Sequence, residues 1–409
     1  MKHILNVIIL SAILSFSCFT AFCQRKSINE NYNRSSLYQI LISHPELKMN
    51  SEIVSAYMSL PVQDKYNDHS LSLKYITASQ KESKKNGKEA IDEFIIKNEI
   101  AKRLVSKWFN RDYTDGGFDV NLIAERGNYN ASQSDVAIAL NSQRGLAMLS
   151  DAGENLIGNT FVIFNDVTYI DKEANAQAAK AVLQVLGAIV GKFVGGAESI
   201  AKLGSSIADA ISGFTVKIES HLYRLEWTEE TSNFFYQNCY YDKKTVNTEK
   251  KQNYINDKEH FKLVYVGSYS SVSSKTTMRG IYKPEDVFRK VLARSIDENI
   301  VSLQRKFEVF KVTVPVYSVK NNMVCAQIGL KEGIDLNSRF EVLERNIDEN
   351  GKTTYVRKGV IKPIKGKIWD NRFMATEEGT NEANLNYTSF EIVSGKDIYP
   401  GMLLRETKF

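Results

Sequence analysis

Apolar residues recur along this chain with two different periods, and the longer period predicts two helices. Between Glu89 and Phe109 they recur at intervals of three and four residues, which predicts one amphipathic helix that ends near Phe109. A second helix is predicted to open at Pro284, because proline is tolerated in the first helical turn. Its apolar stripe consists of Val287, Val291, Leu292, Ile296, Ile300 and Leu303.

Shorter runs of β-branched and aromatic residues predict the strands. The predicted strands are Phe118–Ile123, Thr160–Ile170, Phe214–Trp227, Asn233–Tyr241 and Phe261–Ser268, with Asn233–Tyr241 as the hairpin partner of Phe214–Trp227. A helical stretch from about Ser134 to Leu156 separates the first two strands. This order of strands and helices predicts an α+β protein built on an α/β core domain.

From Phe307 onward the pattern is that of β structure. Phe340–Glu344 and Thr353–Ile361 flank a loop that contains Asn350-Gly351, a pair that favours a hairpin because both residues tolerate positive φ. Glycines punctuate the short strands at positions 329, 333, 359, 366, 395 and 401. The spacing predicts a small carboxy-terminal β-barrel or sandwich.

These patterns divide the chain into four parts. Residues 1–23 are predicted to be a signal peptide and residues 24–86 a polar amino-terminal segment. The charged cluster Lys81–Lys88 marks the boundary to the core domain, residues 87–306, which carries a helical insert at 174–212. Residues 307–409 form the β domain.

The amino terminus indicates secretion. Met1-Lys2-His3 precedes the apolar run Ile4–Cys23, the pattern of a secretory signal, and the mature chain is expected to begin near Gln24. We therefore expect export across the inner membrane to the periplasm or the periphery of the outer membrane. Lipidation at Cys18 or Cys23 and an uncleaved membrane anchor are the alternatives, and serines shorten the apolar run below the roughly 20 residues of a spanning helix.

Net charge and the cysteine positions bear on the possible partners and on disulfide formation. Loss of residues 1–23 removes only Lys2 from the 53 basic residues and leaves all 48 acidic ones, so the mature net charge is +4. This small excess argues against nucleic acid as a partner. The mature chain keeps Cys239 and Cys325, which lie in different predicted domains, so we expect buried thiols in preference to a disulfide.

The insert is the least ordinary part of the sequence. Gly187, Gly191 and Gly195 fall on one helical face, where another helix could approach closely, and Gly195-Gly196 could turn the chain into a helical hairpin. These three glycines are the predicted partner-binding residues. Three interpretations stay open for this face: docking on the protein's own sheet, self-association or binding of a partner helix, and contact with a membrane surface.

No catalytic or cofactor motif accompanies these elements in the sequence. His44, His69, His221 and His260 lie outside any zinc-protease pattern, and Gly191-Lys192 is followed by Phe193 where a phosphate loop needs Ser or Thr. The polar run Asp64–His69 lacks the glycine and the distal glutamate of a calcium loop, so we interpret it as a solvated loop. We expect no catalytic residues, no metal and no cofactor.

Two short stretches resemble a known family. Ile100–Leu104, leading into Phe118–Gly127 with Glu125-Arg126, resembles the helix and strand edge of the curli secretion channel family. That fold is similar to the TolB amino-terminal domain and to the middle domain of flagellar assembly protein T. Gly329–Ile334 and Ser394–Met402 resemble turns of bacterial SH3-like barrels, which usually bind partners or scaffold. The helical pattern of the insert departs from the membrane-crossing β-hairpins of the channels.

The resemblance and the patterns together predict a non-enzymatic envelope protein that acts in assembly or scaffolding through contacts with envelope proteins or with itself. An oligomeric secretion pore component is one alternative. The other is an envelope hydrolase that uses paired carboxylates such as Glu125 or Asp119.

Overall fold

A computed structural model describes residues 35–78, 80–111, 116–120, 123, 154, 156–170, 211–245, 247–278, 284–311, 313–347, 353–376 and 385–407. All of them lie in one compact unit, Asn33–Phe409. The predicted signal peptide, almost all of the insert, and most of the helical stretch predicted for 134–156 lie outside the described residues. Within them the protein is mixed α and β, as predicted.

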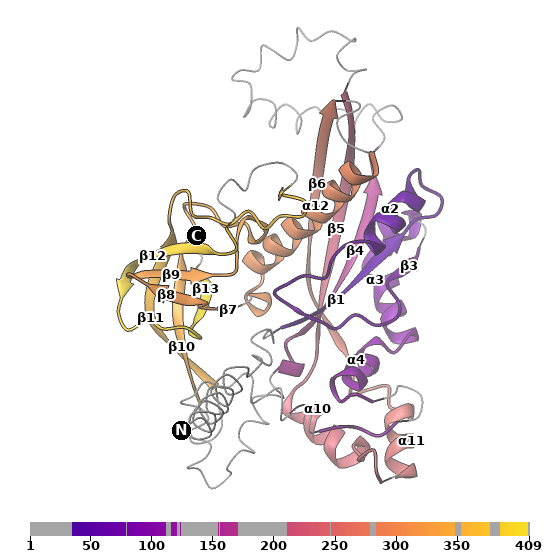
Figure 1. Ribbon diagram of the computed structural model, residues 1–409. Helices are drawn as coiled ribbons and strands as arrows, with labels where there is room; N and C mark the ends of the chain where they lie inside the picture. The colour runs from indigo at the N-terminus through magenta and orange to yellow at the C-terminus, as the bar shows by residue number, and fades with distance from the viewer. Residues whose placement is uncertain are drawn as a thin grey trace, which may run out of the picture. The chain divides into compact units, whose positions relative to one another are not determined.

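The first sheet has the strand order β2-β1-β4-β5-β6, with β3 also paired to β1 (Figure 1). Its strands are β1 (Ser36–Ser43), β2 (Asn67–Asp68), β3 (Tyr75–Thr77), β4 (Thr160–Tyr169), β5 (Ile211–Leu225) and β6 (Leu263–Met278). Strand β1 runs parallel to β2, β3 and β4, whereas β4, β5 and β6 pair antiparallel. The predicted strands 160–170 and 214–227 are therefore confirmed as β4 and β5 within a few residues.

Strand β1 corrects the predicted start of the core domain. It lies inside the region 24–86 that the pattern assigned to a polar segment, yet it pairs with β4 over seven residues and is buried nearly throughout. A strand covered on both faces shows no alternation of apolar and polar residues, so its short apolar run carries little signal. The core sheet therefore begins before residue 87.

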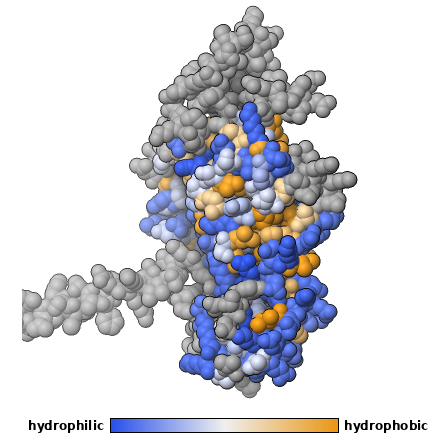
Figure 2. All heavy atoms as spheres, turned by 90° about the vertical axis from the view of Figure 1, so that its right-hand side faces the viewer, coloured by the Kyte–Doolittle hydropathy of each residue, from blue (hydrophilic) through white to orange (hydrophobic). Residues whose placement is uncertain are grey.

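Helices cover both faces of this sheet. On one face α2 (Asn50–Met58) and α12 (Pro284–Lys306) share a hydrophobic core with Phe161 and Ile163 of β4. On the other face α3 (Gln80–Lys97) places Phe94 edge-on against Phe164 at 6.0 Å. Helix α4 (Ile100–Trp108) follows, and its Trp108 donates a hydrogen bond of 2.7 Å to Thr160. Figure 2 shows the side of the molecule that lies on the right in Figure 1, with apolar residues gathered at its middle and a mostly hydrophilic lower part.

Three local predictions are wrong. The helix predicted for 89–109 is divided, because Glu99 has a left-handed backbone with φ of 48° between α3 and α4. Phe118 forms only an isolated bridge to Asp242, and Val120 lies in a turn, so no strand is present at the described residues 118–120 and 123. Asn233–Tyr241 is mostly helical, as described next.

The segment predicted to be a strand at Asn233–Tyr241 is largely α10 (Glu229–Phe234) continued by a π-helical turn, η2 (Phe235–Cys239). The Thr228 side chain caps α10 by accepting a hydrogen bond from the Thr231 backbone N–H, and Glu229 and Glu230 follow in its first turn. Aromatic residues raised the strand propensity of this segment, but their rings pack into a cluster with α11 (Thr248–Asn256). Tertiary packing overrides the local preference here.

The second sheet follows α12 and has the order β7-β13-β10-β11-β12-β9-β8. Its strands are β7 (Val314–Pro315), β8 (Ser318–Lys320), β9 (Met323–Ala326), β10 (Phe340–Ile347), β11 (Thr353–Pro363), β12 (Thr388–Gly395) and β13 (Leu403–Glu406), and two short 3₁₀ helices are η3 (Glu308–Phe310) and η4 (Leu330–Glu332). Strands β7 and β8 are nearly consecutive in the chain and stand at opposite ends of the order, so the sheet curls strongly around its own core. The predicted hairpin of 340–344 with 353–361 is confirmed.

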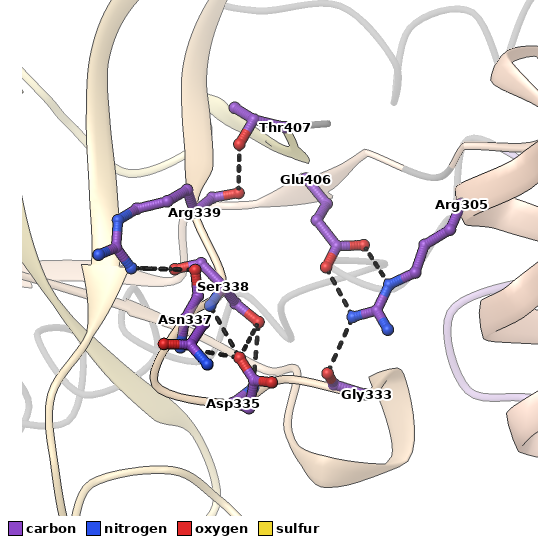
Figure 3. Close-up of polar contacts among 8 residues, drawn as sticks. All are labelled: Arg305, Gly333, Asp335, Asn337, Ser338, Arg339, Glu406 and Thr407. Atoms are coloured by element: carbon purple, nitrogen blue, oxygen red, sulfur yellow. Dashed lines mark hydrogen bonds and ion pairs between the residues drawn. The ribbon is translucent and has the colours of Figure 1, made fainter. Parts of the chain in front are cut away.

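An ion pair joins the end of α12 to the second sheet. Figure 3 shows Arg305 directing its guanidinium at Glu406, the last residue of β13. Its Nη2 donates hydrogen bonds of 2.8 Å to Glu406 Oε1 and 3.0 Å to the Gly333 carbonyl. One side chain therefore contacts both η4's end and β13.

Two glycines of the second sheet allow its turns to be tested. Gly395 and Gly401 both have positive φ, 102° and 93°, but a Cβ at Gly395 would overlap the Lys358 carbonyl whereas a Cβ at Gly401 meets open space. Gly401→Ala should lower the free energy of unfolding by about 1–3 kcal/mol through backbone strain alone. Gly395→Ala should cost more, because strain and overlap add. Urea unfolding of both variants checks this, and equal losses would contradict it.

Candidate functional site

The structure brings together few of the residues that the sequence put forward. Gly187, Gly191, Gly195 and Glu125 lie outside the described residues. Asp119 is described, and its backbone N–H donates to the Phe109 carbonyl at 2.8 Å. Cys239 and Cys325 are confirmed as buried thiols, and burial raises the pKa of Cys239 to about 12.

Strand β6 is the most extended feature of the first sheet. It pairs with β5 over its whole length, from Leu263 to Met278, whereas the pairing of β4 with β5 stops at Val216. The two strands therefore continue as a ribbon past the end of β4 (Figure 1). The part of this ribbon beyond β4 contains residues of β6 that lie past the predicted strand 261–268.

The outer edge of β6 offers backbone groups for pairing. Among the described residues, no further strand pairs with β6 on the side away from β5. Lys306 donates a hydrogen bond of 3.2 Å to the Ser268 carbonyl. The strand has no proline, and Lys275 is its one charged residue. Proline and charge are the usual protections of an exposed edge, and β6 carries little of either.

A pair of titratable side chains lies between β1 and β4. Buried His44 faces an oxygen with each ring nitrogen: Nδ1 lies 2.7 Å from the Ala78 carbonyl, and Nε2 lies 2.7 Å from Asp166 Oδ1. Both acceptors are satisfied only when both nitrogens carry hydrogen. Burial is the largest influence and opposes this charge, but the hydrogen bond and charge of Asp166, with the Ala78 carbonyl, outweigh it and raise the His44 pKa.

A second histidine on β5 has the opposite character. His221 is buried, and its Nε2 lies 3.7 Å from Glu219 Oε1. Desolvation dominates over the attraction of Glu219 and Asp166 and lowers the His221 pKa. Asp166 and Glu219 are cross-strand partners, so two histidines of opposite tendency share one acidic neighbourhood.

A cavity of about 260 Å³ lies where the first sheet, α2 and α12 meet residues of the second sheet's loops. Apolar side chains supply about half of its wall, among them Tyr57 and Met58 of α2, Ile296 of α12 and Phe373. Polar groups converge from three directions: Gln63 and Asp64 after α2, Asp297 on α12, and Lys331 on η4. An apolar pocket with a few convergent polar groups is the usual form of a ligand site.

The charges around this cavity are arranged in pairs. Lys331 Nζ lies 3.1 Å from Asp64 Oδ2, whose side chain is 79% exposed. Nearby, Lys65 lies 3.7 Å from Glu332, and both side chains are largely buried. Asp297 is different, because Gln63 Nε2 donates to its Oδ1 at 2.7 Å while burial raises its pKa to about 6.

Sequence reasoning missed Asp297 as a site residue. Asp297 follows Ile296, a member of the apolar stripe that the spacing identified. A carboxylate at the border of a buried stripe was the sequence signal that could have marked it as a site residue. The interpretation of the polar run Asp64–His69 as a solvated loop is wrong. His69 is buried against Trp108 with ring centroids 4.6 Å apart, and Asp64 pairs with Lys331.

Among the described residues, no three His, Cys, Asp or Glu side chains stand close enough to hold a metal ion. Within the same ranges, no helix combines the length and the apolar character that a membrane crossing requires.

No protein-family model matches this sequence, and no curated protein matches it either.

The two histidines allow a pH test of this region. A raised pKa means that the fold favours protonated His44, so this contribution to stability is complete below its ordinary pKa of 6.5 and is lost as pH rises through the folded value. A lowered pKa means that the fold favours neutral His221, so its contribution is complete above 6.5 and is lost as pH falls through the folded value.

His44→Gln should therefore remove the loss of stability on the alkaline side, and His221→Gln should remove the loss on the acidic side. The measurement is the free energy of unfolding in urea between about pH 5 and 8.5, a range that spans histidine titration. Profiles that run parallel to the unmodified protein for both variants would contradict the assignment.

Proposed function

We propose that this protein is a non-enzymatic, secreted envelope protein that acts in assembly or scaffolding through protein–protein contacts. The observation that carries the proposal is the edge of β6, a strand of 16 residues that no other described strand covers on its outer side. Backbone N–H and C=O groups along such an edge can pair with an extended strand of another chain. Serines and threonines dominate the second half of β6, Ser271–Met278, so the proposed contact does not depend on a large apolar patch.

The fold adds a second kind of support. A mixed sheet with helices on both faces, followed by a strongly curled small sheet, is compatible with the resemblance to curli channels, TolB amino-terminal domains and SH3-like barrels. In this proposal the protein works in the periplasm or at the periphery of the outer membrane after its signal peptide is removed. We further propose that the insert at 174–212, predicted from the sequence as a helical hairpin, binds a partner helix or a second copy through its glycine face.

The carboxylates near the cavity support a binding role in preference to paired-acid hydrolysis. Asp64 is largely exposed and held by Lys331, whereas Asp297 is buried and held by Gln63. Hydrolysis by paired carboxylates needs two acids that face one substrate with matched roles. Here Asp64 is engaged in an ion pair with Lys331, whereas Asp297 lies where α12 lines the cavity.

The β6 edge can be tested with one charge. Ser270 is exposed and lies opposite Glu219, so Ser270→Lys should keep the β5–β6 ladder while placing a lysine on the edge, which discourages strand addition. A photo-crosslinking residue at exposed Val264 of β6 reports the contact in producing cells, with mass spectrometry identifying the captured chain. We expect at least a tenfold loss of that crosslink in Ser270→Lys.

Ser394→Lys is the matched control, because Ser394 is an exposed strand residue of the second sheet. Its crosslink should equal that of the unmodified protein. Crosslinking that survives Ser270→Lys would exclude the β6 edge as the contact surface. Capture of a second copy, with rings by size and dye release from vesicles, would replace the assembly role by the pore alternative.

The glycine face calls for a separate variant. Gly191→Leu should block close approach of a partner helix, so the crosslinked partner should be lost while circular dichroism and the unfolding midpoint stay unchanged. A partner that survives this change would exclude the face. Loss of folding would show that the face packs inside the molecule, because leucine then overpacks a buried crossing.

A further inference from the structure

The cavity between α2, α12 and the second sheet contains one charge that its surroundings compensate only in part. Asp297 is 7% exposed and lines the cavity wall from the middle of α12. Among the described residues, Gln63 is the hydrogen-bond donor to this carboxylate, and it reaches Oδ1. No donor to the other oxygen, Oδ2, is found among these residues, so Oδ2 can accept a hydrogen bond from a molecule in the cavity.

The two lysines that attract Asp297, Lys331 and Lys65, are both already engaged, and Lys65 lies 3.7 Å from Glu332. Lys331 attracts Asp297, but its ammonium group also holds Asp64 at 3.1 Å, and Asp64 lies at the exposed side. Burial remains the strongest influence on Asp297 and raises its pKa to about 6, so the positive charge present does not offset the cost of desolvating the carboxylate. A further cation placed at Asp297 would offset more of that cost.

The other lining residues indicate which kind of molecule would bear this positive charge. Leu37, Ala293, Ile296 and the rings of Tyr57 and Phe373 supply apolar wall, and the polar lining also includes Gln39, Lys74 and Asn371. The Tyr57 hydroxyl accepts from Asn165 at 3.2 Å, which fixes its ring in the wall. Aromatic faces and aliphatic side chains favour an apolar body, and aromatic faces also attract an ammonium group.

We propose that this cavity binds a small primary ammonium compound with an apolar body, and that Asp297 is its counter-ion. A volume of about 260 Å³ accommodates a single aromatic ring with a short aliphatic amine. The ammonium group donates to Asp297 Oδ2, and the body lies among Tyr57, Ile296 and Phe373. This site is independent of the β6 edge, so either proposal can fail without the other.

Matched probes separate the charge from the body. Phenethylamine is cationic at neutral pH, whereas 2-phenylethanol has nearly the same shape and no charge. Binding of each to the full mature chain is measured by ligand-observed NMR titration at pH 7.5. We expect phenethylamine to bind at least tenfold more tightly than 2-phenylethanol. Binding of phenethylamine should weaken about tenfold for each pH unit below about 6, because Asp297 must then lose a proton first.

Variants assign the preference to Asp297. Asp297→Asn keeps an oxygen for Gln63 and removes the charge, so the two probes should bind equally. Glu298→Gln removes the neighbouring charge, which lies outside the cavity wall, and should keep the preference for the amine. Ala293→Phe fills the cavity and should abolish binding of both probes. Equal binding of the probes to the unmodified chain, no binding of phenethylamine, or a preference that survives Asp297→Asn would overturn the proposal.

Discussion

A chain of buried hydrogen bonds fixes the position of α12 on the first sheet, and most of the structure depends on that position. Asn299 of α12 donates to Ser220 Oγ of β5 at 2.9 Å, and Ser220 Oγ donates to Asn165 of β4 at 2.7 Å. Asn165 in turn donates to the Tyr57 hydroxyl of α2 at 3.2 Å. Apolar packing alone tolerates a helix that slides along a sheet, but a buried amide that loses its partner costs about 1–3 kcal/mol. The polar chain therefore sets the register of α12 against β5, β4 and α2.

That register decides what the rest of α12 can contact. Its stripe, from Phe288 to Leu303, faces the sheet, and Asp297 reaches the cavity beside α2. About two turns after Asp297, Arg305 holds Glu406 and Gly333, so the second sheet is attached to a helix that the first sheet has already oriented. At the same end Lys306 contacts the edge of β6. One helix thus holds the inner core, a cavity wall, the second sheet and a sheet edge.

The sequence predicts the parts of this arrangement whose signal is local. The stripe after Pro284 and the hairpin around Asn350-Gly351 are read correctly, because helical periodicity and turn chemistry act over a few residues. Strand β1 escapes recognition, since burial on both faces removes alternation. The segment 233–241 is misread because aromatic side chains favour strands in general, whereas here their rings pack on α11 and the Thr228 cap starts a helix.

The candidate site is harder to predict than the fold, for a reason that Asp297 illustrates. Its burial, its contact with Gln63 and its place near Lys331 join three segments that are distant in the chain, and no spacing rule connects them. The open edge of β6 is equally non-local, because an edge exists only by virtue of which strands lie beside it. Both features nevertheless involve α12, because its Asp297 lines the cavity and its Lys306 reaches Ser268 of β6. A change in the Asn299–Ser220–Asn165 chain should therefore disturb cavity and edge together, whereas a change at Asp297 or Ser270 acts on one of them.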